Sequence, residues 1–282
     1  WWPADVQLIG KDIIRFHCLY WPAVLHAAGV PVPSREFAQG WITKNGKKLS
    51  KTTGNVIDPG QLVDQYGADA LRYFLLREGT YGQDWDFTDA AFVTRFNADL
   101  ANDLGNLVSR ALTMARNFCG GRVPAATDAG DGTPPGGSIF GKYEALDFSG
   151  ALTEIWGLVS QLNQEIVSFA PWVVAKDPTR RQDLDNFLYR LLDRVRLVAV
   201  LVFPVMPTAA GRVFRMLGLP GGEPGPGDLV WGRLVPGAPL GTIEALFPRI
   251  DNKKEKTVTE TKPPAVPAES EPTGAATQQP AG

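Results

Sequence analysis

Apolar and polar residues follow two different periods along this chain, and the change falls near Ala90. Before that point, the short apolar and β-branched run at 6–9, ended by Gly10, predicts a buried strand, and the segment 37–43 predicts a second strand. Apolar residues recur at helical spacing from 13 to 24, which predicts a helix. Proline lacks the N–H that a helix needs, so we expect this helix to kink or break at Pro22.

Turn and capping residues divide the rest of the N-terminal part. Asn45-Gly46 is a turn signal, and a polar, lysine-rich loop follows over 47–55. Asp58-Pro59 combines an N-cap residue with a proline at the first helical position, so a helix should start there and stop at Gly67. A second helix is expected from Asp69 onward.

Long helical periodicity takes over after Ala90, at 92–118, 146–169 and 184–205, with a shorter segment at 207–217. Such a run of helices predicts a bundle. The Gly- and Pro-rich stretch 120–137 is expected to be a surface loop. The tail is too poor in large apolar residues to order itself. We therefore predict an α/β part over 1–88, a helix bundle over 89–248 and a disordered tail over 249–282.

Composition and charge narrow the classes of function. A net charge of −2 does not suggest a protein that coats nucleic acid by charge alone, although a local patch can still bind RNA. The two cysteines, Cys18 and Cys119, lie far apart, so neither a disulfide framework nor a zinc knuckle is indicated. Free thiols suit a reducing, cytoplasmic compartment. The longest apolar run, 197–206, has about half the length of a membrane span and predicts a buried helix.

The lysine-rich loop is the sharpest chemical motif. Lys48 and Lys51 flank Ser50 between a predicted strand and a capped helix. Ammonium and hydroxyl groups in such a loop can bind a polyphosphate, but a solvated lysine turn has the same composition. Gly10 and Asp12 follow a predicted strand, where the backbone can approach a nucleotide ribose. A helix-capping role for Asp12 is equally compatible with its position.

A second group of candidates lies in the predicted bundle. Asn106 and Arg110 are four residues apart and so share a helix face. Trp172, in Ala170-Pro171-Trp172, sits at a predicted helix end. An amide, a guanidinium and an exposed indole can together read unstacked RNA bases. The alternative is a salt-bridged surface arginine and a buried tryptophan.

These motifs resemble one enzyme family. The segment Lys48-Leu49-Ser50-Lys51-Thr52 resembles the KMSKS motif of class I aminoacyl-tRNA synthetases, with Leu for Met and Thr for the last Ser. The flanking segments are similar to the methionyl-tRNA synthetases within that class. They are 9–13, 16–17, 20–23, 58–59, 66–73 and 81–87. The resemblance extends from about residue 6 to about residue 217 and fades in the loop before Tyr143.

The resemblance implies a mainly α fold with a partial α/β part. This would be the end of a Rossmann-like class I catalytic domain followed by an antiparallel anticodon-binding bundle. It implies ATP-dependent activation of methionine, with Mg²⁺, and transfer to tRNA(Met). By this resemblance Lys48, Ser50 and Lys51 are catalytic. Gly10 and Asp12, with the two lysines, bind ATP, whose phosphoryl transfer is helped by electrostatics.

The resemblance also assigns the two specificity sites. Phe16, His17 and Trp21 would form the methionine pocket, because aromatic rings suit a polarizable sulfur, although aromatics at helical spacing also suit a core. Asn106, Arg110 and Trp172 would read the CAU anticodon. The expected partners are tRNA(Met), methionine and ATP, with no membrane and no metal site in this chain. No folded dimerisation appendage follows the bundle, so we expect a monomer.

Two expected motifs are missing from the sequence. The HIGH motif and the cysteines of the family's zinc insertion do not occur, and the chain begins at Trp1 without a methionine. We therefore expect a C-terminal portion that is not active alone, with any zinc in the absent N-terminal half. The alternatives are a stand-alone anticodon-binding module and another class I synthetase, for cysteine, leucine, isoleucine or valine.

Overall fold

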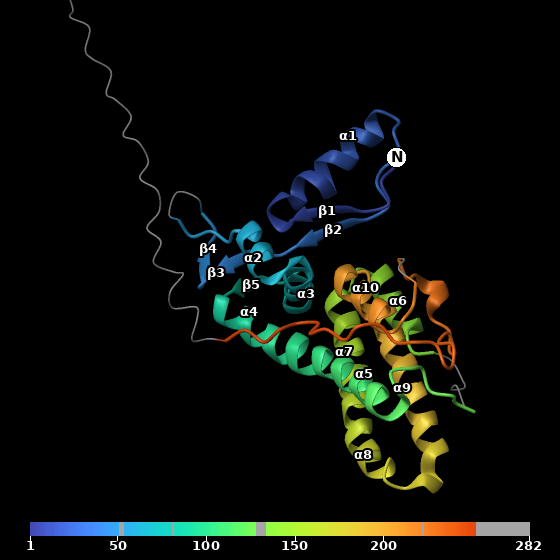
Figure 1. Cartoon of the computed structure of the whole chain (residues 1–282). Coiled ribbons are helices and arrows are strands. Elements are labelled where there is room, and N and C mark those ends of the chain that lie inside the picture. Colours follow the sequence, from blue (N-terminus) through green and yellow to red (C-terminus); the bar gives the residue numbers. More distant parts are fainter. Residues whose placement is uncertain (51–53, 81, 128–133, 221–222, 252–282) are drawn as a thin grey trace, which may run out of the picture. The chain divides into compact units, whose positions relative to one another are not determined.

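The computed structural model describes residues 1–50, 54–80, 82–127, 134–220 and 223–251. The predicted disordered tail lies outside these residues from position 252 onward. Helices make up most of the described chain, which also contains two small sheets (Figure 1). The mainly helical fold predicted from the sequence is therefore confirmed. The finer division at residues 88 and 248 stays a prediction.

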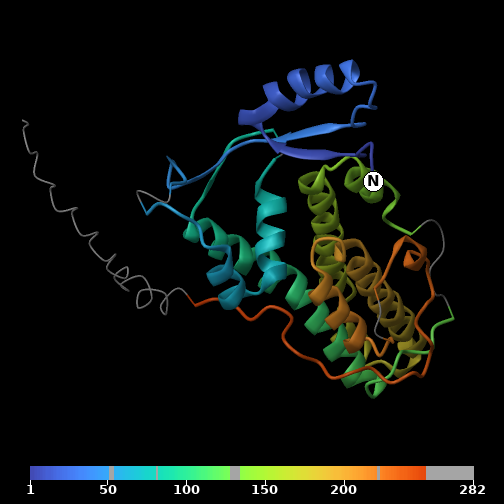
Figure 2. The ribbon, with the colours of Figure 1, turned by 90° about the horizontal axis from the view of Figure 1, so that it is seen from above.

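The first sheet holds two parallel strands. β1 (Gln7–Gly10) pairs with β2 (Glu36–Gln39), and Gln7 lies opposite Glu36. α1 (Trp21–Ala27) connects the strands and lies along one side of the pair in both views (Figures 1 and 2). Ile9 is the buried residue of β1 and Leu25 that of α1. Leu8 is 66% exposed, so the prediction of a buried first strand was wrong.

The helix through Pro22 does not break, which corrects one of the two expected outcomes. A 3₁₀ turn, Lys11–Ile13, leads into a π-helical turn, Phe16–Tyr20, and then into α1. The Trp21 N–H donates to the Phe16 carbonyl, five residues back, instead of four. The wider turn lies directly before Pro22, where proline removes one hydrogen-bond donor and crowds the preceding turn.

The segment 37–43 is not one strand, and this prediction was wrong. β2 ends at Gln39, and β3 (Ile42–Lys44) belongs to a second sheet. In that sheet β3 lies between the antiparallel β4 (Lys47–Lys48) and the parallel β5 (Trp85–Phe87). Gly40 marks the change of sheet because a Cβ there would lie 2.0 Å from the Gln83 carbonyl oxygen. Only glycine lets the two backbones come this close.

The predicted turn and caps are confirmed. Asn45 and Gly46 join β3 to β4 with φ of 54° and 71°, the left-handed pair that a two-residue hairpin requires. α2 (Pro59–Tyr66) is capped by the Asp58 carboxylate, which accepts from the Gly60 N–H at 2.9 Å. α2 ends at Gly67, and α3 (Ala68–Glu78) begins one residue before the predicted start.

The long helices fall where the periodicity predicts them. α4 (Asp89–Arg95), a π-helical segment (Phe96–Gly105) and α5 (Asn106–Cys119) follow without a break, and Gly120 ends them with a φ of 62°. The other long helices are α7 (Phe148–Phe169), α9 (Arg181–Val202) and α10 (Pro207–Met216). The sequence did not reveal α6 (Gly137–Glu144) or the one-turn α8 (Pro171–Val174).

The helices share one apolar core, formed mainly by α5, α7 and α9. Most of the apolar run at 197–206 is buried, as predicted, but its helix ends at Val202 and Pro204 is exposed. No helix in the described ranges has the length and apolar content that a membrane span requires.

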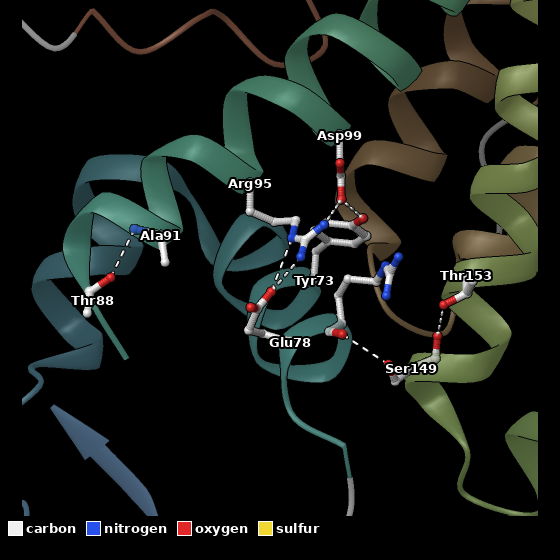
Figure 3. A network of polar contacts seen from close by, with 9 residues as sticks. Tyr73, Glu78, Thr88, Ala91, Arg95, Asp99, Ser149 and Thr153 are labelled. Atoms are coloured by element: carbon white, nitrogen blue, oxygen red, sulfur yellow. Dashed lines mark hydrogen bonds and ion pairs between the residues drawn. The ribbon is translucent and has the colours of Figure 1, made fainter. Parts of the chain in front are cut away.

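α3 joins this core through a partly buried polar network. Figure 3 shows Tyr73 and Arg95 converging on Asp99, with Glu78 beside Arg95. The Tyr73 hydroxyl donates to Asp99 Oδ2 at 2.6 Å, and Arg95 Nη2 lies 2.8 Å from Glu78 Oε2. The Tyr73 ring also packs on Trp156 of α7, with centroids 4.4 Å apart. These contacts fix α3 against the long helices.

Two further residues of α3 bind the junction between α9 and α10. Asp69 Oδ2 accepts from the Ala209 N–H at 2.6 Å and so caps the start of α10 from outside that helix. Burial raises the pKa of Asp69. Arg72 donates to the carbonyls of Val205 and Pro204 at 2.8 and 2.9 Å. The 66–73 segment thus connects the first part of the chain to the last long helix.

Beyond α10 the chain runs over the helices as a mostly non-helical strap, residues 223–250 (Figure 2). The Tyr189 hydroxyl donates to the Leu234 carbonyl at 2.9 Å. Arg196, almost fully buried beside Asp193, donates to the Asp228 carbonyl at 2.7 Å. At the far end, the Asn97 amide exchanges two hydrogen bonds with the backbone of Ile250.

Candidate functional site

The lysine loop rises from the β3–β4 hairpin and is closed at its base. Lys48 is the last residue of β4, and the Ser50 N–H donates to the Asn55 carbonyl at 2.9 Å. Lys51 and Thr52 lie outside the described residues, so the role assigned to Lys51 stays a prediction. The described part agrees with a loop between a strand and the capped helix α2.

Two polar side chains hold the hairpin beneath the loop. The Asn55 amide donates to the carbonyls of Lys44, Lys47 and Lys48 at 3.1–3.3 Å. Asp86 Oδ1 accepts from Thr43 Oγ1 and from the Gly46 N–H, both at 2.7 Å. These two hydrogen bonds hold the pKa of Asp86 below its usual value. Side-chain hydrogen bonds therefore hold the hairpin from which the loop extends.

The Lys48 ammonium lies over an indole that it shares with another lysine. Lys48 Nζ is 5.6 Å from the centroid of Trp41, and Lys11 Nζ is 4.3 Å from it. Lys11 also forms an ion pair with Asp84 at 2.6 Å. Asp84 Oδ1 accepts a hydrogen bond from the backbone N–H of Trp41 at 2.8 Å. The hydrogen bond from Lys11, first, and that from Trp41 hold the pKa of Asp84 below its usual value.

Sequence reasoning missed Trp41, Lys11 and Asp84. Lys11 lies between the candidates Gly10 and Asp12. Trp41 lies in the predicted strand before the lysine loop, and Asp84 lies in the segment 81–87. The contact between Lys11 and Asp84 joins residues 73 positions apart, and no local pattern reveals such a pairing.

Gly10 and Asp12 lie at the carboxyl end of β1, as predicted. Asp12 is exposed, and its carboxylate folds back over Gly10, where a Cβ would lie 2.6 Å from Asp12 Oδ1. Glycine at position 10 therefore makes room for the carboxylate. No side-chain capping bond forms at the start of the 3₁₀ turn or of the π-helical turn that follows.

The three aromatic pocket candidates lie on the π-helical turn and at the start of α1, and His17 among them is half-buried. Phe16 is 58% and Trp21 40% exposed, so neither is a core residue in the described chain. The Phe16 ring meets Tyr20 edge-on, and the Trp21 ring meets Trp2 in the same way. His17 Nδ1 lies 3.1 Å from the Ile13 carbonyl one turn earlier, which orients the imidazole. The methionine-pocket role of these three residues stays a prediction.

The structure brings two of the three anticodon candidates together. Asn106 and Arg110 line a groove of about 540 Å³ between α5 and α7. The other lining residues are Asn102, Asp103, Ser160, Asn163, Gln164, Val167 and Ser168. Trp172 stands on α8 instead and does not line this groove, but its indole is 46% exposed. The alternative of a buried tryptophan is therefore excluded.

The groove also presents a polar atom that the sequence did not reveal. Asn163 donates through Nδ2 to the carbonyls of Val159 and Asp103, at 3.2 and 3.3 Å. Its buried Oδ1 has no hydrogen-bond partner among the described residues. An unused acceptor in a groove that Arg110 also lines suits a ligand with both donors and acceptors. Burial and the nearby Asp99 raise the pKa of Asp103, a further lining residue.

Comparisons with known proteins agree with this geometry. A family model described as "tRNA synthetases class I (M)" matches residues 1–112. The methionine–tRNA ligase of Caldanaerobacter subterraneus is 43% identical over 265 residues, which are 90% of this chain and 41% of that protein. The methionine–tRNA ligase of Enterococcus faecalis is 44% identical over 230 residues, or 78% of this chain and 34% of that protein.

Solved structures show the same likeness. Mycobacterium tuberculosis methionyl-tRNA synthetase bound by methionyl-adenylate aligns with a TM-score of 0.81 and 39% identity. The alignment covers 88% of this chain and 50% of that one. Its apo form aligns with a TM-score of 0.80, 38% identity and 89% of this chain.

This chain spans about two fifths of the length of the first curated relative and half of the solved synthetase chains. The family-model match over residues 1–112 includes the lysine hairpin and the helix that carries Phe16, His17 and Trp21. The resemblance inferred from the motifs is thus confirmed by identity across about nine tenths of the chain. Over about nine tenths of its length, this chain is similar to the methionyl-tRNA synthetases of class I.

Proposed function

We propose that this protein is a cytoplasmic methionine–tRNA ligase. The methionine carboxylate attacks the α-phosphorus of Mg²⁺-bound ATP, which forms methionyl-adenylate and releases pyrophosphate. A ribose hydroxyl of tRNA(Met) then attacks the activated carbonyl and releases AMP. The observation that carries this proposal is the likeness, at 39% identity, to a solved synthetase bound by methionyl-adenylate.

In this proposal the lysine loop acts on the ATP phosphates at the end of a Rossmann-like catalytic domain. Lys48 and Lys51 neutralise charge that builds on the phosphoryl oxygens, and the Ser50 hydroxyl adds a hydrogen bond. Such help is mainly electrostatic. Gly10 and Asp12 lie at the carboxyl end of β1, where α/β folds bind nucleotides, so we assign them to the ATP ribose.

Phe16, His17 and Trp21 are the proposed methionine-binding residues. The exposure of Phe16 and Trp21 leaves both rings available to a substrate. A thioether gains roughly 0.3–1.5 kcal/mol from each aromatic contact, which favours methionine over branched apolar amino acids. The bond between His17 and Ile13 gives the imidazole a fixed orientation.

The proposed reader of the CAU anticodon is an antiparallel bundle that presents Asn106, Arg110 and Trp172. The groove next to Arg110 offers both hydrogen-bond donors and the free Asn163 acceptor, and the exposed Trp172 indole offers a stacking surface. Unstacked bases are recognised by this combination of stacking and edge contacts.

The catalytic assignment is tested by methionine-dependent pyrophosphate exchange with the full-length protein. We expect Lys48→Ala and Lys51→Ala to lower kcat far more than they raise the KM for ATP. The lysines act mainly as charge develops in the transition state, where one electrostatic group is worth about 10²–10³-fold. Lys47→Ala, one residue earlier on the same hairpin, is the charge-matched control. Equal losses in the control contradict the assignment.

The anticodon assignment is tested by comparing adenylate formation with tRNA charging. Trp172→Ala should cost about 1–3 kcal/mol of tRNA recognition and Arg110→Ala roughly 1.5–3 kcal/mol, while adenylate formation is unchanged. Val173→Ala, at an equally exposed neighbour of Trp172, is the control. A Trp172→Ala protein that prefers the CAU anticodon as strongly as the wild type would rule out this role.

A further inference from the structure

The Trp41 ring lies between Lys48, at the start of the lysine loop, and Lys11, directly after β1. Trp41 lies on the connection between β2 and β3, and its side chain is 44% exposed. Two ammonium groups approach its ring, Lys11 at 4.3 Å and Lys48 at 5.6 Å from the centroid. Both distances are within the roughly 6 Å over which a cation is attracted to an aromatic face.

The backbone of Trp41 is held from two sides. Its N–H donates to Asp84 Oδ1 at 2.8 Å, and its carbonyl accepts from the Trp85 N–H at 3.1 Å. Gly40, directly before it, makes the close backbone contact with Gln83. The indole is therefore attached to a fixed stretch of chain at the start of β3.

The two lysines on the ring differ in their charge balance. Lys11 is neutralised by the Asp84 carboxylate at 2.6 Å. For Lys48, no carboxylate lies within ion-pair distance in the part of the chain that the structure describes. An ammonium group without a counter-ion, held against a ring beside the end of β1, is free to attract an anion such as a polyphosphate.

We propose that Trp41 is a positioning residue of the lysine loop: its ring holds the Lys48 ammonium beside the carboxyl end of β1, ready for the phosphates of ATP. This role rests on the proposed function and deepens it. A lysine side chain has many rotamers, and a preferred contact with the ring reduces the number that must be lost when ATP binds. Asp84 supports the arrangement by neutralising Lys11 and binding the Trp41 backbone.

Kinetics of pyrophosphate exchange test the role through a double-mutant cycle on the full-length protein. A cation–π contact at an exposed site corresponds to about a two- to fivefold effect, so Trp41→Leu should lower kcat/KM for ATP by that factor. Trp41→Phe keeps an aromatic face and should restore most of the loss. In a Lys48→Met background, Trp41→Leu should have no further effect, because the ring then has no loop lysine to position. Additive losses would overturn the proposal.

A second measurement reads the ring contact without relying on activity. In the 282-residue chain with labelled lysines, NMR should show the ε-methylene protons of Lys48 shifted upfield by the ring current of Trp41. The shift should disappear in Trp41→Leu. Lys47 points to the other face of β4, by the alternation of a strand, and is the unshifted control. Unshifted Lys48 protons in the wild type overturn the proposal.

The two measurements separate the two levels of inference. A wild-type protein that lacks methionine-dependent exchange but shows the Lys48 shift overturns the proposed function and upholds the ring contact. An active wild-type protein whose Trp41→Leu variant keeps full kcat/KM overturns the positioning role and upholds the proposed function. A melting temperature common to the variants and the wild type excludes simple unfolding as the cause of a loss.

Discussion

The buried contact between Tyr73 and Asp99 should contribute measurably to stability. Tyr73 is fully buried on α3, and its hydroxyl donates to Asp99 Oδ2 at 2.6 Å. Tyr73→Phe removes this one oxygen and keeps the ring, including its packing on Trp156. The change creates almost no cavity, so the loss of free energy of unfolding measures the hydrogen bond to the carboxylate.

The expected loss follows from the charge of the acceptor and from its burial. A hydrogen bond to an ionised group contributes about 1.5–3 kcal/mol, against roughly 0.5–1.5 kcal/mol for a neutral pair. Asp99 is 9% exposed, so water replaces the lost donor poorly, and Arg95 at 3.4 Å is a long second partner. We therefore expect Tyr73→Phe to lower the free energy of unfolding by about 1.5–3 kcal/mol.

Tyr143→Phe provides a matched control. The Tyr143 hydroxyl donates to the Leu201 carbonyl at 2.9 Å, so the same change removes a hydrogen bond to a neutral acceptor. Urea unfolding, followed by far-UV circular dichroism, would compare the free energies of unfolding of the two variants. If Tyr73→Phe costs no more than Tyr143→Phe, the charged network does not stabilise the attachment of α3 to the long helices.

Three further outcomes follow from local contacts. Asp69→Ala should lower the free energy of unfolding by about 1–3 kcal/mol because the Ala209 N–H loses its partner, whereas Asp69→Asn keeps an acceptor and should cost much less; urea unfolding compares them. Burial and Asp185 raise the pKa of Cys119 to about 11, so a thiol reagent at pH 8 should modify exposed Cys18 quickly and Cys119 slowly, with the slow phase faster toward pH 11 and absent in Cys119→Ser. Asn55→Ala removes three hydrogen bonds to the hairpin and should speed hydrogen exchange at the Ser50 amide without changing exchange in α2. Unchanged exchange at Ser50 would show that the Asn55 side chain does not hold the hairpin.

Much of the fold could be predicted because its signals are local. Helical periodicity located α5, α7, α9 and α10, and the Asp58-Pro59 pair located α2 to the residue. The failures have non-local causes. The segment 37–43 reads as one strand, but the approach of Gln83 to Gly40 divides it between two sheets. α6 begins among glycines, so tertiary packing of Ile139 outweighs its weak helix propensity.

The residues of the candidate site also fall into those that a local pattern reveals and those that it does not. Lys48, Gly10 and Asp12 were found because their neighbours form a local motif, and Asn106 with Arg110 because a spacing of four places both on one helix face. Trp41, Lys11, Asp84 and the free Asn163 acceptor were missed. Their contacts depend on chain crossings that only the folded structure provides.

The π-helical segment before α5 has a consequence for insertions and deletions in this chain. Each residue added to a helix turns everything after it by about 100° relative to what came before. The wider π-helical turns of Phe96–Gly105 thus help to set the angle between Phe92, which packs on Tyr66 of α2, and Arg110, which lines the groove. Deleting one residue there would turn the part of the helix beyond it by about 100°. It would also rotate the groove face away from α7 while every side chain named above remained in the sequence, so length in this segment is constrained independently of residue identity.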